Sequence, residues 1–428
     1  MPETEPNETL ELVTTTLASS GAAVARHQGK AVFVYGAAPE ERVLARITRR
    51  SKRYDEAELV SVVSPSPDRV EAPCPLFGSC GGCMLQHVRY ERQVQEKHRM
   101  LDDALTRVGG QRFTPIKVFA SPKPYGTRLK ARMRYREGKI GFFSQSSHDF
   151  VAFDDCPALE PELNALLRAL RSALVRHAMK EAELEAAWSP EESLGAVALE
   201  LEKAPAGLAA LLERDLPKLK GVALWAGHEE SAGNPVLRLD GVPHDVRAFW
   251  QAHAELNRQA KMFLANEAKE LMQELERPLL MLELFAGSGN LSSALIPYAA
   301  RLIAVETEGL ACRSLTAFSR ERDWPLKVIR SDVENGLERV QGTRFDLVVL
   351  DPPRAGLENG MELLVALQPR KILYQSCDPA TLARDVKKLA GEGYALRNAA
   401  MFDFFPQTRH VEAVAVFVRS CPNGAGVL

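Results

Sequence analysis

The 428-residue chain lacks any apolar run that approaches the roughly 20 residues needed to cross a bilayer. Its opening segment, MPETEPNETLEL, is acidic, whereas a secretory signal begins with basic residues followed by an apolar stretch. It also lacks internal repeats and low-complexity tracts. We therefore expect a cytoplasmic protein of several domains that has no membrane partner.

The chain also has little net charge, −2, which does not by itself suggest a nucleic-acid partner. Two local segments are nonetheless basic: RITRRSKR at residues 46–53 and KPYGTRLKARMRYREGK at residues 123–139. Either segment alone is equally well explained as solvated surface. The two together, with Tyr125 and Tyr135 interleaved in the second, favour a track for RNA or DNA.

Residues 10–64 alternate apolar and polar residues in short runs punctuated by glycine and proline, a pattern that predicts a small β-barrel. The segment SPSPDRVEAPCP breaks this pattern and is expected to be a linker. Helical patterns follow at residues 88–108 and 161–188, while GAVALELE and GVALWAG indicate strands of a middle region.

From about Leu279 the chain predicts a parallel, doubly wound sheet, because apolar strand candidates alternate there with helical segments. The candidates are LLMLELF, RLIAVE, LKVIRSD, FDLVVLDPP and RKILYQS. Two further runs, YALRNAAMFDFF and EAVAVFVR, must pair antiparallel because only PQTRH separates them.

The first strand of this sheet ends in ELFAGSGNLS, where Gly287 and Gly289 permit a tight turn and a close approach to a ligand. A dinucleotide fingerprint would have a third glycine where Ser292 stands. Glu306 ends the second strand, where it can accept hydrogen bonds from ribose hydroxyls. An acid at the end of each strand, combined with Gly-x-Gly, favours S-adenosylmethionine over NAD. Tight packing would explain Gly-x-Gly alone.

A thiol and a carboxylate are predicted beside this loop. Asp351, in DPPR, follows the fourth strand and Cys377 follows the fifth, so both open into one cleft, and Glu412 begins the last strand at the same edge. Thiolate attack at carbon 6 of a pyrimidine activates carbon 5 toward a methyl donor, and a base must then remove the carbon 5 proton. We expect Cys377 to be the nucleophile and Glu412 the base. Either residue alone is better explained by packing or solvation.

Three cysteines, Cys74, Cys80 and Cys83, lie within CPLFGSCGGC, and Cys156 lies in DDCP. In a cytosolic protein such a set indicates a metal site before a disulfide framework. Four thiolates suit either zinc or a 4Fe-4S cluster. Zinc sites usually have two Cys-x-x-Cys hooks, which differs from this spacing.

Taken together, these segments resemble the S-adenosylmethionine-dependent RNA uracil-5 methyltransferases, most closely the branch acting on 23S ribosomal RNA. The resemblance covers nearly the whole chain, with FWQAH, ELFAGSGN, DPPRAG, SCDPATLARD and HVEAV in family order. It implies an α/β fold with an N-terminal OB-like TRAM β-barrel that binds RNA (8–66), a central α+β domain (67–250) and a Rossmann-like class I methyltransferase domain (251–420).

By this resemblance Cys377 and Glu412 match the family's nucleophile and base, and the cysteine loop matches an iron-sulfur motif, which favours 4Fe-4S over zinc. The residues that would line the cofactor and base pocket are Gln251, Phe285, Asn290, Glu306, Asp332 and Asp351. Two positions depart from the family pattern, because Asp378 and His253 stand where asparagine is common. We expect the charge of Asp378 to disfavour the thiolate.

The implied activity is formation of 5-methyluridine in 23S rRNA by a monomeric enzyme. The alternatives are a tRNA uracil-5 methyltransferase, a cytosine-5 or DNA methyltransferase, and an RNA-binding or assembly protein that has lost turnover. The barrel argues against a DNA substrate, and Asp378 lends weight to loss of turnover. Ser292 and the lack of a second cofactor-binding half disfavour a nicotinamide oxidoreductase.

Overall fold

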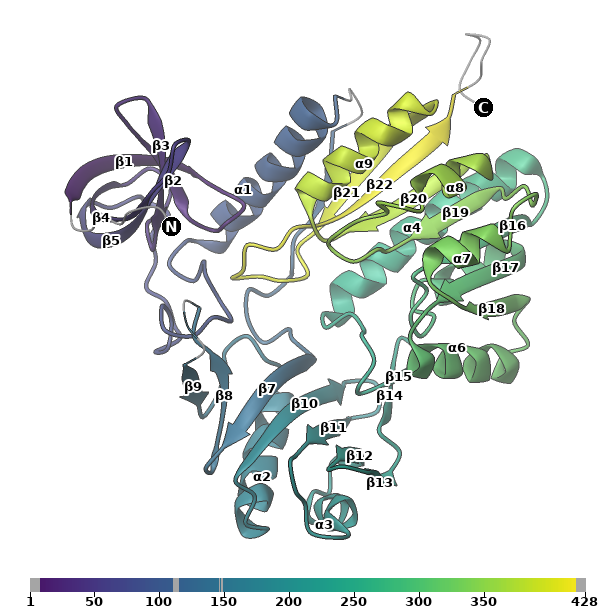
Figure 1. Ribbon diagram of the computed structural model, residues 1–428, viewed down its shortest axis with the longest axis horizontal. Coiled ribbons are helices and arrows are strands. Elements are labelled where there is room, and N and C mark those ends of the chain that lie inside the picture. The colour runs from purple at the N-terminus through teal and green to yellow at the C-terminus, as the bar shows by residue number, and fades with distance from the viewer. Residues whose placement is uncertain (1–7, 111–114, 146, 148, 421–428) are drawn as a thin grey trace. The chain divides into compact units, whose positions relative to one another are not determined.

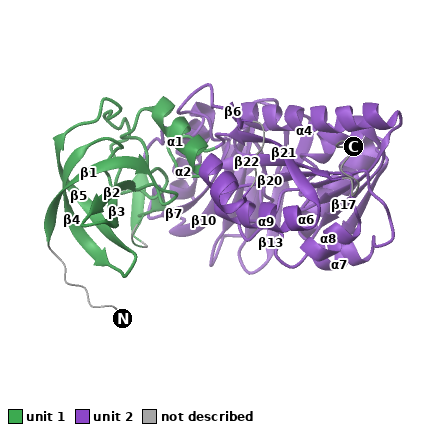
Figure 2. Cartoon of the chain, turned by 90° about the horizontal axis from the view of Figure 1, so that it is seen from above, with its two compact units in different colours: residues 1–100, 142–153, 405–410 green, residues 101–141, 154–404, 411–428 purple. Residues whose placement is uncertain are grey.

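The computed structural model describes residues 8–110, 115–145, 147 and 149–420. The chain divides into two compact units, neither of which is continuous in sequence (Figure 2). The first unit comprises residues 1–100, 142–153 and 405–410, and the second comprises residues 101–141, 154–404 and 411–428. The domain boundaries expected at residues 66 and 250 stay predictions. No helix in the described part of the chain is long and apolar enough to span a membrane.

The first unit contains a closed barrel whose strands are ordered β1-β2-β3-β5-β4 (Figure 1). Small and branched side chains such as Ala25, Val32 and Ala45 fill its interior, each at most 1% exposed. They alternate with exposed polar residues, which is the pattern that predicted the OB-like barrel, and that prediction is confirmed. The strands are β1 Thr9–Leu17, β2 Ala23–His27, β3 Lys30–Tyr35, β4 Arg42–Arg50 and β5 Tyr54–Ser64.

Helix α1 (Tyr90–Asp103) holds the distant segment 405–410 in the same unit. The side chains of Gln93 and Gln407 meet, with Gln93 Nε2 donating to Gln407 Oε1 at 2.9 Å. The backbone N–H of Gln407 donates in return to Gln93 Oε1 at 3.1 Å. The ammonium of Lys97 donates to the carbonyl of Phe405 at 3.0 Å. The connection between the last two strands is therefore anchored at its middle. Strand β9 (Phe150–Phe153) also belongs to this unit.

The second unit contains a central sheet in the order β13-β12-β11-β10-β7-β8. The helical pattern expected through residue 188 is wrong for its last part, because β10 occupies Glu181–Ser189. Ala182, Leu184 and Ala186 are buried while the glutamates between them are not, so pairing with β7 outweighs the helix propensity of Ala, Glu and Leu. The other elements are β7 Lys130–Arg136, β8 Lys139–Phe143, β11 Leu194–Glu200, β12 Leu219–Trp225, β13 Glu229–Gly233, α2 Pro161–Arg176 and α3 Leu208–Asp215.

The same unit contains an eight-stranded sheet in the order β18-β17-β16-β19-β20-β22-β21-β6. Its parallel strands and the antiparallel β21 and β22 confirm the predicted doubly wound fold, whereas the short parallel β6 was not predicted. The strands are β6 Lys117–Phe119, β16 Leu279–Leu284, β17 Ala299–Glu306, β18 Leu326–Arg330, β19 Leu347–Leu350, β20 Lys371–Ser376, β21 Tyr394–Phe402 and β22 Glu412–Arg419.

Helices cover both faces of this sheet, with α4 on one side and α7, α8 and α9 on the other (Figure 1). A short hairpin of β14 (Val236–Leu239) and β15 (Val242–Asp245) precedes α4. The helices are α4 Ala254–Leu275, α5 Ser292–Leu295, α6 Gly309–Glu321, α7 Val333–Glu338, α8 Met361–Ala366 and α9 Pro379–Gly391.

Candidate active site

The loop after β16 contains two glycines, Gly287 and Gly289, which look equivalent in sequence but have different surroundings. Both adopt left-handed backbone angles, φ +54° at Gly287 and φ +93° at Gly289. A Cβ added at Gly287 would meet no atom within 4 Å, so this glycine borders open space. A Cβ at Gly289 would lie 2.4 Å from Cδ1 of Leu315 on α6, closer than packing permits. Packing against α6 and a φ of +93° therefore both favour glycine at position 289, whereas at position 287 only the left-handed φ does.

Glu306, at the end of β17, ties this loop to the sheet. Its Oε2 accepts a hydrogen bond from the backbone N–H of Gly287 at 2.8 Å. Its Oε1 accepts from the N–H groups of Thr307 and Glu308, both at 2.7 Å. A carboxylate has about four acceptor positions and three of these are used, so Glu306 can accept about one further hydrogen bond.

Glu283, the acid near the end of β16, is buried and accepts a hydrogen bond from the hydroxyl of Ser292. Burial raises the pKa of Glu283 to about 8, so this carboxyl is largely protonated at neutral pH. Ser292 stands where a dinucleotide fingerprint would have glycine, and its role here is to hold this buried acid.

Asn290 is held by a residue that the sequence did not reveal. Its Nδ2 donates to Oδ1 of Asn257 at 2.7 Å, and Nδ2 of Asn257 donates back to Oδ1 of Asn290 at 3.0 Å. Asn257 is 1% exposed and lies in the first turn of α4. Asn257 follows Gln251, which is also buried, but the spacing of these two residues matches no motif that would predict the contact with Asn290. The reciprocal amide pair fixes which way the Asn290 side chain points.

His253 and Asp332 both cap helices. Nδ1 of His253 accepts from the N–H of Leu256 at 3.3 Å, and its Nε2 lies 2.8 Å from the hydroxyl of Ser121. Burial lowers the pKa of His253 to about 4, so the imidazole is neutral. Asp332 is exposed and caps α7, where hydrogen bonds from the backbone and side chain of Asn335 lower its pKa.

Cys377 and Glu412 are brought together by strand register. Ser376 and Ala413 form the last pair of the β20–β22 ladder, and Cys377 and Glu412 each lie one residue beyond that pair, at the same end of the two strands. Glu412 is 6% exposed and the thiol is half-buried. The charge of Glu412 acts on the Cys377 thiol at this strand end.

Asp351, after β19, acts through its charge on the Cys377 thiol and accepts a hydrogen bond from Nε2 of Gln375 at 3.1 Å. Burial raises the pKa of Asp351 to about 7. Burial, with Glu412 and Asp351, also raises the pKa of the Cys377 thiol to about 11, while the charge of Arg354 lowers it. The carboxylate of Asp378, which was expected to disfavour the thiolate, instead caps α9 by accepting from the N–H groups of Ala380 and Thr381.

Three buried polar atoms near these loops have no hydrogen-bond partner within the described chain. They are Ser288 Oγ in the glycine loop, Gln375 Oε1 beside Asp351, and Trp250 Nε1 next to Gln251. Leaving such an atom unpaired costs about 1–3 kcal/mol, so these positions are suited to a ligand or bound water that supplies the missing partner. Together with the open space at Gly287, they fit a polar cofactor.

The predicted metal ligands are divided between the two units. Cys74, Cys80 and Cys83 belong to the first unit and Cys156 to the second. The N–H of Gly82 points at Sγ of Cys80 at 3.4 Å, a contact that favours a thiolate. Among the residues that the structure describes, no three His, Cys, Asp or Glu side chains are grouped closely enough to hold a metal ion.

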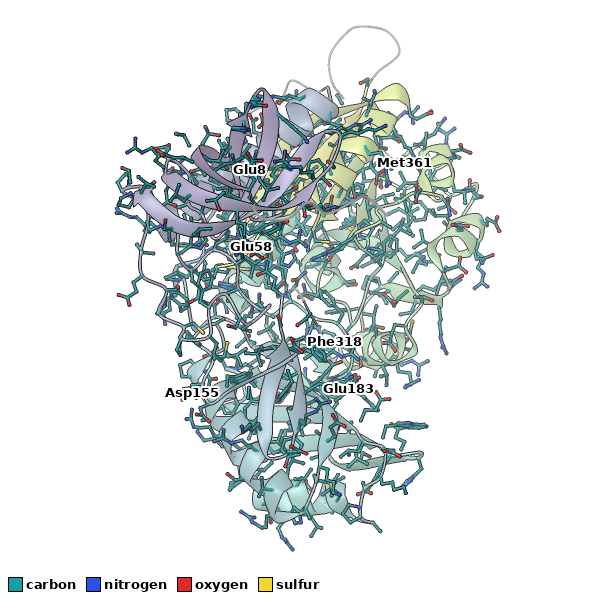
Figure 3. The ribbon with its side chains drawn as sticks, turned by 60° about the vertical axis from the view of Figure 1, so that its left-hand side comes forward. Glu8, Glu58, Asp155, Glu183, Phe318 and Met361 are labelled. Atoms are coloured by element: carbon teal, nitrogen blue, oxygen red, sulfur yellow. The ribbon has the colours of Figure 1, made fainter. Side chains whose placement is uncertain are left out.

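The basic segment at residues 123–139 is largely neutralised. On β7 its cations line one face of the central sheet, opposite glutamates of β10, among them Glu183 (Figure 3). Tyr135 is fully buried and donates to the carbonyl of Met179, so it cannot stack on a base. The ion pairs are Lys130–Glu185 at 3.0 Å, Arg132–Glu183 at 2.7 Å, Arg134–Glu183 at 2.6 Å and Arg136–Glu181 at 2.6 Å.

Comparison with known proteins identifies the family. A family model described as tRNA (Uracil-5-)-methyltransferase matches residues 334–420. The chain is 33% identical to the 23S rRNA (uracil(1939)-C(5))-methyltransferase RlmD of Alkalilimnicola ehrlichii, over 98% of each chain. It is also 33% identical to RlmD of Pectobacterium atrosepticum, over 96% of this chain and 94% of that one. The chain belongs to the RNA uracil-5 methyltransferase family.

The fold of this RNA uracil-5 methyltransferase is also that of a solved family structure. The crystal structure of Pyrococcus abyssi tRNA (uracil-54, C5)-methyltransferase in complex with S-adenosyl-L-homocysteine superposes with a TM-score of 0.75. The two chains are 21% identical, and the match covers 96% of this chain and all of that one. The resemblance stated from the sequence is confirmed, and so are the barrel and the class I methyltransferase sheet that it implied.

Proposed function

We propose that this chain is an S-adenosylmethionine-dependent methyltransferase that forms 5-methyluridine in 23S rRNA. The observation that carries the proposal is that Cys377 and Glu412 lie at adjoining strand ends, on the sheet edge that also carries the glycine loop. The names of the near full-length relatives support 23S rRNA as the substrate. We place the reaction in the cytoplasm and expect the enzyme to act as a monomer.

The residues at the strand edge fit S-adenosylmethionine, which supplies an electrophilic methyl group when bound. Gly287 borders open space, and Glu306 has an acceptor position left for a ribose hydroxyl. Asn290 is pre-oriented by Asn257, so little side-chain entropy is lost on binding. The proposed set that lines the cofactor and base pocket is Gln251, Phe285, Gly287, Gly289, Asn290, Glu306, Asp332 and Asp351.

Cys377 would attack carbon 6 of the target uracil as the thiolate and form a C–S bond, which turns carbon 5 into a nucleophile. After carbon 5 gains the methyl group, Glu412 would remove its proton, and the C–S bond would break to release the thiolate. The support for this role is that Glu412 is buried and that its charge acts on the Cys377 thiol.

Two variants separate these roles. Cys377→Ala should form no covalent link to RNA, whereas Glu412→Gln should attack and methylate, then stall as a methylated adduct that survives denaturing electrophoresis. RNA with 5-fluorouridine at the target should trap the wild-type enzyme, because fluorine cannot leave as a cation. An adduct formed by Cys377→Ala, or methylation at the wild-type rate, would reject the mechanism.

The choice between ribosomal and transfer RNA is tested separately. We expect 5-methyluridine to disappear from 23S rRNA, and not from tRNA, in cells that lack this protein. Purified enzyme should methylate a 23S rRNA fragment from those cells in preference to their tRNA. Loss of the base from tRNA alone would favour the tRNA methyltransferase, and no change in either RNA would favour an assembly protein.

We also propose that Cys74, Cys80, Cys83 and Cys156 hold a 4Fe-4S cluster. The support is the all-thiolate donor set and the backbone N–H that points at Cys80. Protein purified without oxygen should absorb in the visible and contain about four irons per chain. Cys83→Ser should lose both signals. Stoichiometric zinc without iron would reject the cluster.

A further inference from the structure

The segment SCDPATLARD contains three residues that the proposed chemistry does not use: Thr381, Arg384 and Asp385. All three lie in the first two turns of α9, which begins directly after Cys377 and its neighbour Asp378. Asp385 is fully buried, although aspartate is among the residues least often found inside proteins. A buried carboxylate needs hydrogen-bond donors around it, and those donors show what this helix end is holding.

These side chains bind the backbone of the loop that follows Asp351. Thr381 Oγ1 donates to the carbonyl of Arg354 at 2.9 Å, and an Arg384 guanidinium nitrogen donates to the carbonyl of Ala355 at 2.7 Å. The N–H of Leu357 donates to Oδ2 of Asp385 at 3.1 Å. The N-terminal end of α9 thus fixes the backbone of this loop at Arg354, Ala355 and Leu357.

Asp385 is itself held from two further directions. The hydroxyl of Tyr374 on β20 donates to its Oδ2 at 2.7 Å, and Nε of Arg384 donates to its Oδ1 at 2.9 Å. The loop approaches so closely that a Cβ on Gly356 would lie 2.5 Å from Oδ2 of Asp385. Gly356 also has φ +78°, which favours glycine. Asp385 therefore joins a strand, a helix and a loop in the fold.

Arg354 is the residue of this loop whose charge acts on the Cys377 thiol, and its backbone carbonyl is the group that Thr381 holds. The groups that act electrostatically on the Cys377 thiol are Glu412 from β22, Asp351 from the loop after β19, and Arg354 from the same loop. The two carboxylates disfavour the thiolate, and the guanidinium favours it. The position of the loop backbone thus sets how strongly the Arg354 guanidinium stabilises the Cys377 thiolate.

We propose that Thr381, Arg384 and Asp385 are positioning residues, which clamp the backbone of residues 354–357 so that the Arg354 guanidinium stays beside the thiol of Cys377. The proposal rests on the proposed function of Cys377 and adds to it the device that helps this thiol to ionise.

The test measures thiol reactivity without RNA or cofactor, so it is independent of whether Cys377 attacks uracil. Alkylation of the full-length protein by iodoacetamide is followed from pH 7 to pH 10, and the Cys377 peptide is quantified by mass spectrometry. Cys312 is an internal control, since burial also raises its pKa to about 11 and it lies on α6. Lys387→Ala, on the same helix as the clamp, is the control variant.

Arg354→Gln should slow alkylation of Cys377 about tenfold at a given pH, which corresponds to one pKa unit. Asp385→Asn should slow it about fivefold and Thr381→Val about twofold, since each loosens the loop without removing the charge. Thr381→Ser, which keeps the hydroxyl, should restore the wild-type rate. In the Arg354→Gln background, Asp385→Asn should have no further effect.

The rate of Cys312 should be the same in every variant. If Asp385→Asn fails to fold, the pair Thr381→Val and Thr381→Ser carries the test. The proposal is overturned if Thr381→Val alkylates like the wild type at every pH. It is also overturned if the effect of Asp385→Asn persists in full without Arg354.

Discussion

The outer face of the central sheet and the carboxyl edge of the catalytic sheet are both rich in charged residues, but they use charge in opposite ways. On the central sheet, Arg132 and Arg134 lie within 2.7 Å of Glu183, and these groups remain accessible to water. At the catalytic edge, Glu283 and Asp351 are desolvated, and burial raises their pKa values to about 8 and about 7. The difference teaches that the density of charge in a sequence is a weaker indicator of function than desolvation of a few groups.

The largest effect should come from the open space beside Gly287. Gly287→Leu places a side chain in space that the structure leaves open, although the left-handed φ of +54° costs a leucine about 1–2 kcal/mol of folding stability. The protein should still fold, and its affinity for S-adenosylmethionine should fall about a hundredfold, or about 2.8 kcal/mol. Calorimetric titration measures the affinity, and thermal unfolding checks the fold.

Gly289→Ala is the matched variant, and it should show the opposite pattern. Its Cβ would overlap Leu315, so unfolding free energy should fall by about 1–3 kcal/mol from overpacking. In a Leu315→Ala background, where the overlapped side chain is gone, Gly289→Ala should cost less than it does in the wild type. If Gly289→Ala were as stable as the wild type while Gly287→Leu bound the cofactor normally, the assignment of the two glycines would be reversed.

Much of the catalytic half could be predicted from sequence, because its parallel strands are buried on both faces and appear as continuous apolar runs. The placement of Cys377 and Glu412 at adjoining strand ends follows from the same information, once β20 and β22 are aligned antiparallel. Less predictable was β6, whose three residues are too few to show a period. Strand β10 was mistaken for helix, because Ala, Glu and Leu favour helix. The alternation of its apolar and charged residues indicates a strand only once β7 is known to pair with it.

Contacts between segments distant in sequence could not be predicted. Asn257 and Asn290 lie 33 residues apart, and the loop of Arg354 is held by side chains 27 to 29 residues later. Polar side chains at such separations carry no periodic signal, since what selects them is a single partner in space. The capping role of Asp378 was missed for a similar reason, because the carboxylate is directed at the N-terminus of α9, and the effect of its charge on the thiol stays a prediction.

A second, smaller effect should appear in stability rather than in binding. Glu283 takes up a proton on folding, because its pKa rises from the model-peptide value of 4.5 to about 8. The stabilisation that protonated Glu283 gives to the folded protein is therefore fully present below about pH 4.5. It is lost as pH rises toward 8, at a rate on the order of 1 kcal/mol per pH unit.

Glu283→Gln should remove this slope. Urea unfolding between pH 5 and pH 8 should show the wild type losing stability over a range where Glu283→Gln changes little, with exposed Glu270→Gln behaving like the wild type. Parallel curves for the wild type and Glu283→Gln would mean that the carboxyl is ionised in the folded protein, and the distinction between the two charged regions would weaken.

The smallest effect is expected on the central sheet, where pairing offsets the basic segment. Replacing both Arg132 and Arg134 with glutamine should lower RNA affinity at most about twofold, because Glu183 already neutralises part of their charge and exposed pairs contribute little. Glu183→Gln should do the reverse: it frees both guanidinium groups for phosphates and steepens the dependence of log affinity on log salt by about 0.9 for each phosphate gained. Lys52 and Arg53, exposed in the turn between β4 and β5, are the comparison, and their replacement by glutamine should weaken binding more than loss of the paired arginines does.

Filter binding to a 23S rRNA fragment over a salt series measures the affinity of the wild type and of the three variants. A large loss of RNA affinity when Arg132 and Arg134 are both replaced would show that RNA displaces Glu183 from these arginines. This face of the central sheet would then bind RNA, and its charges would not serve stability alone.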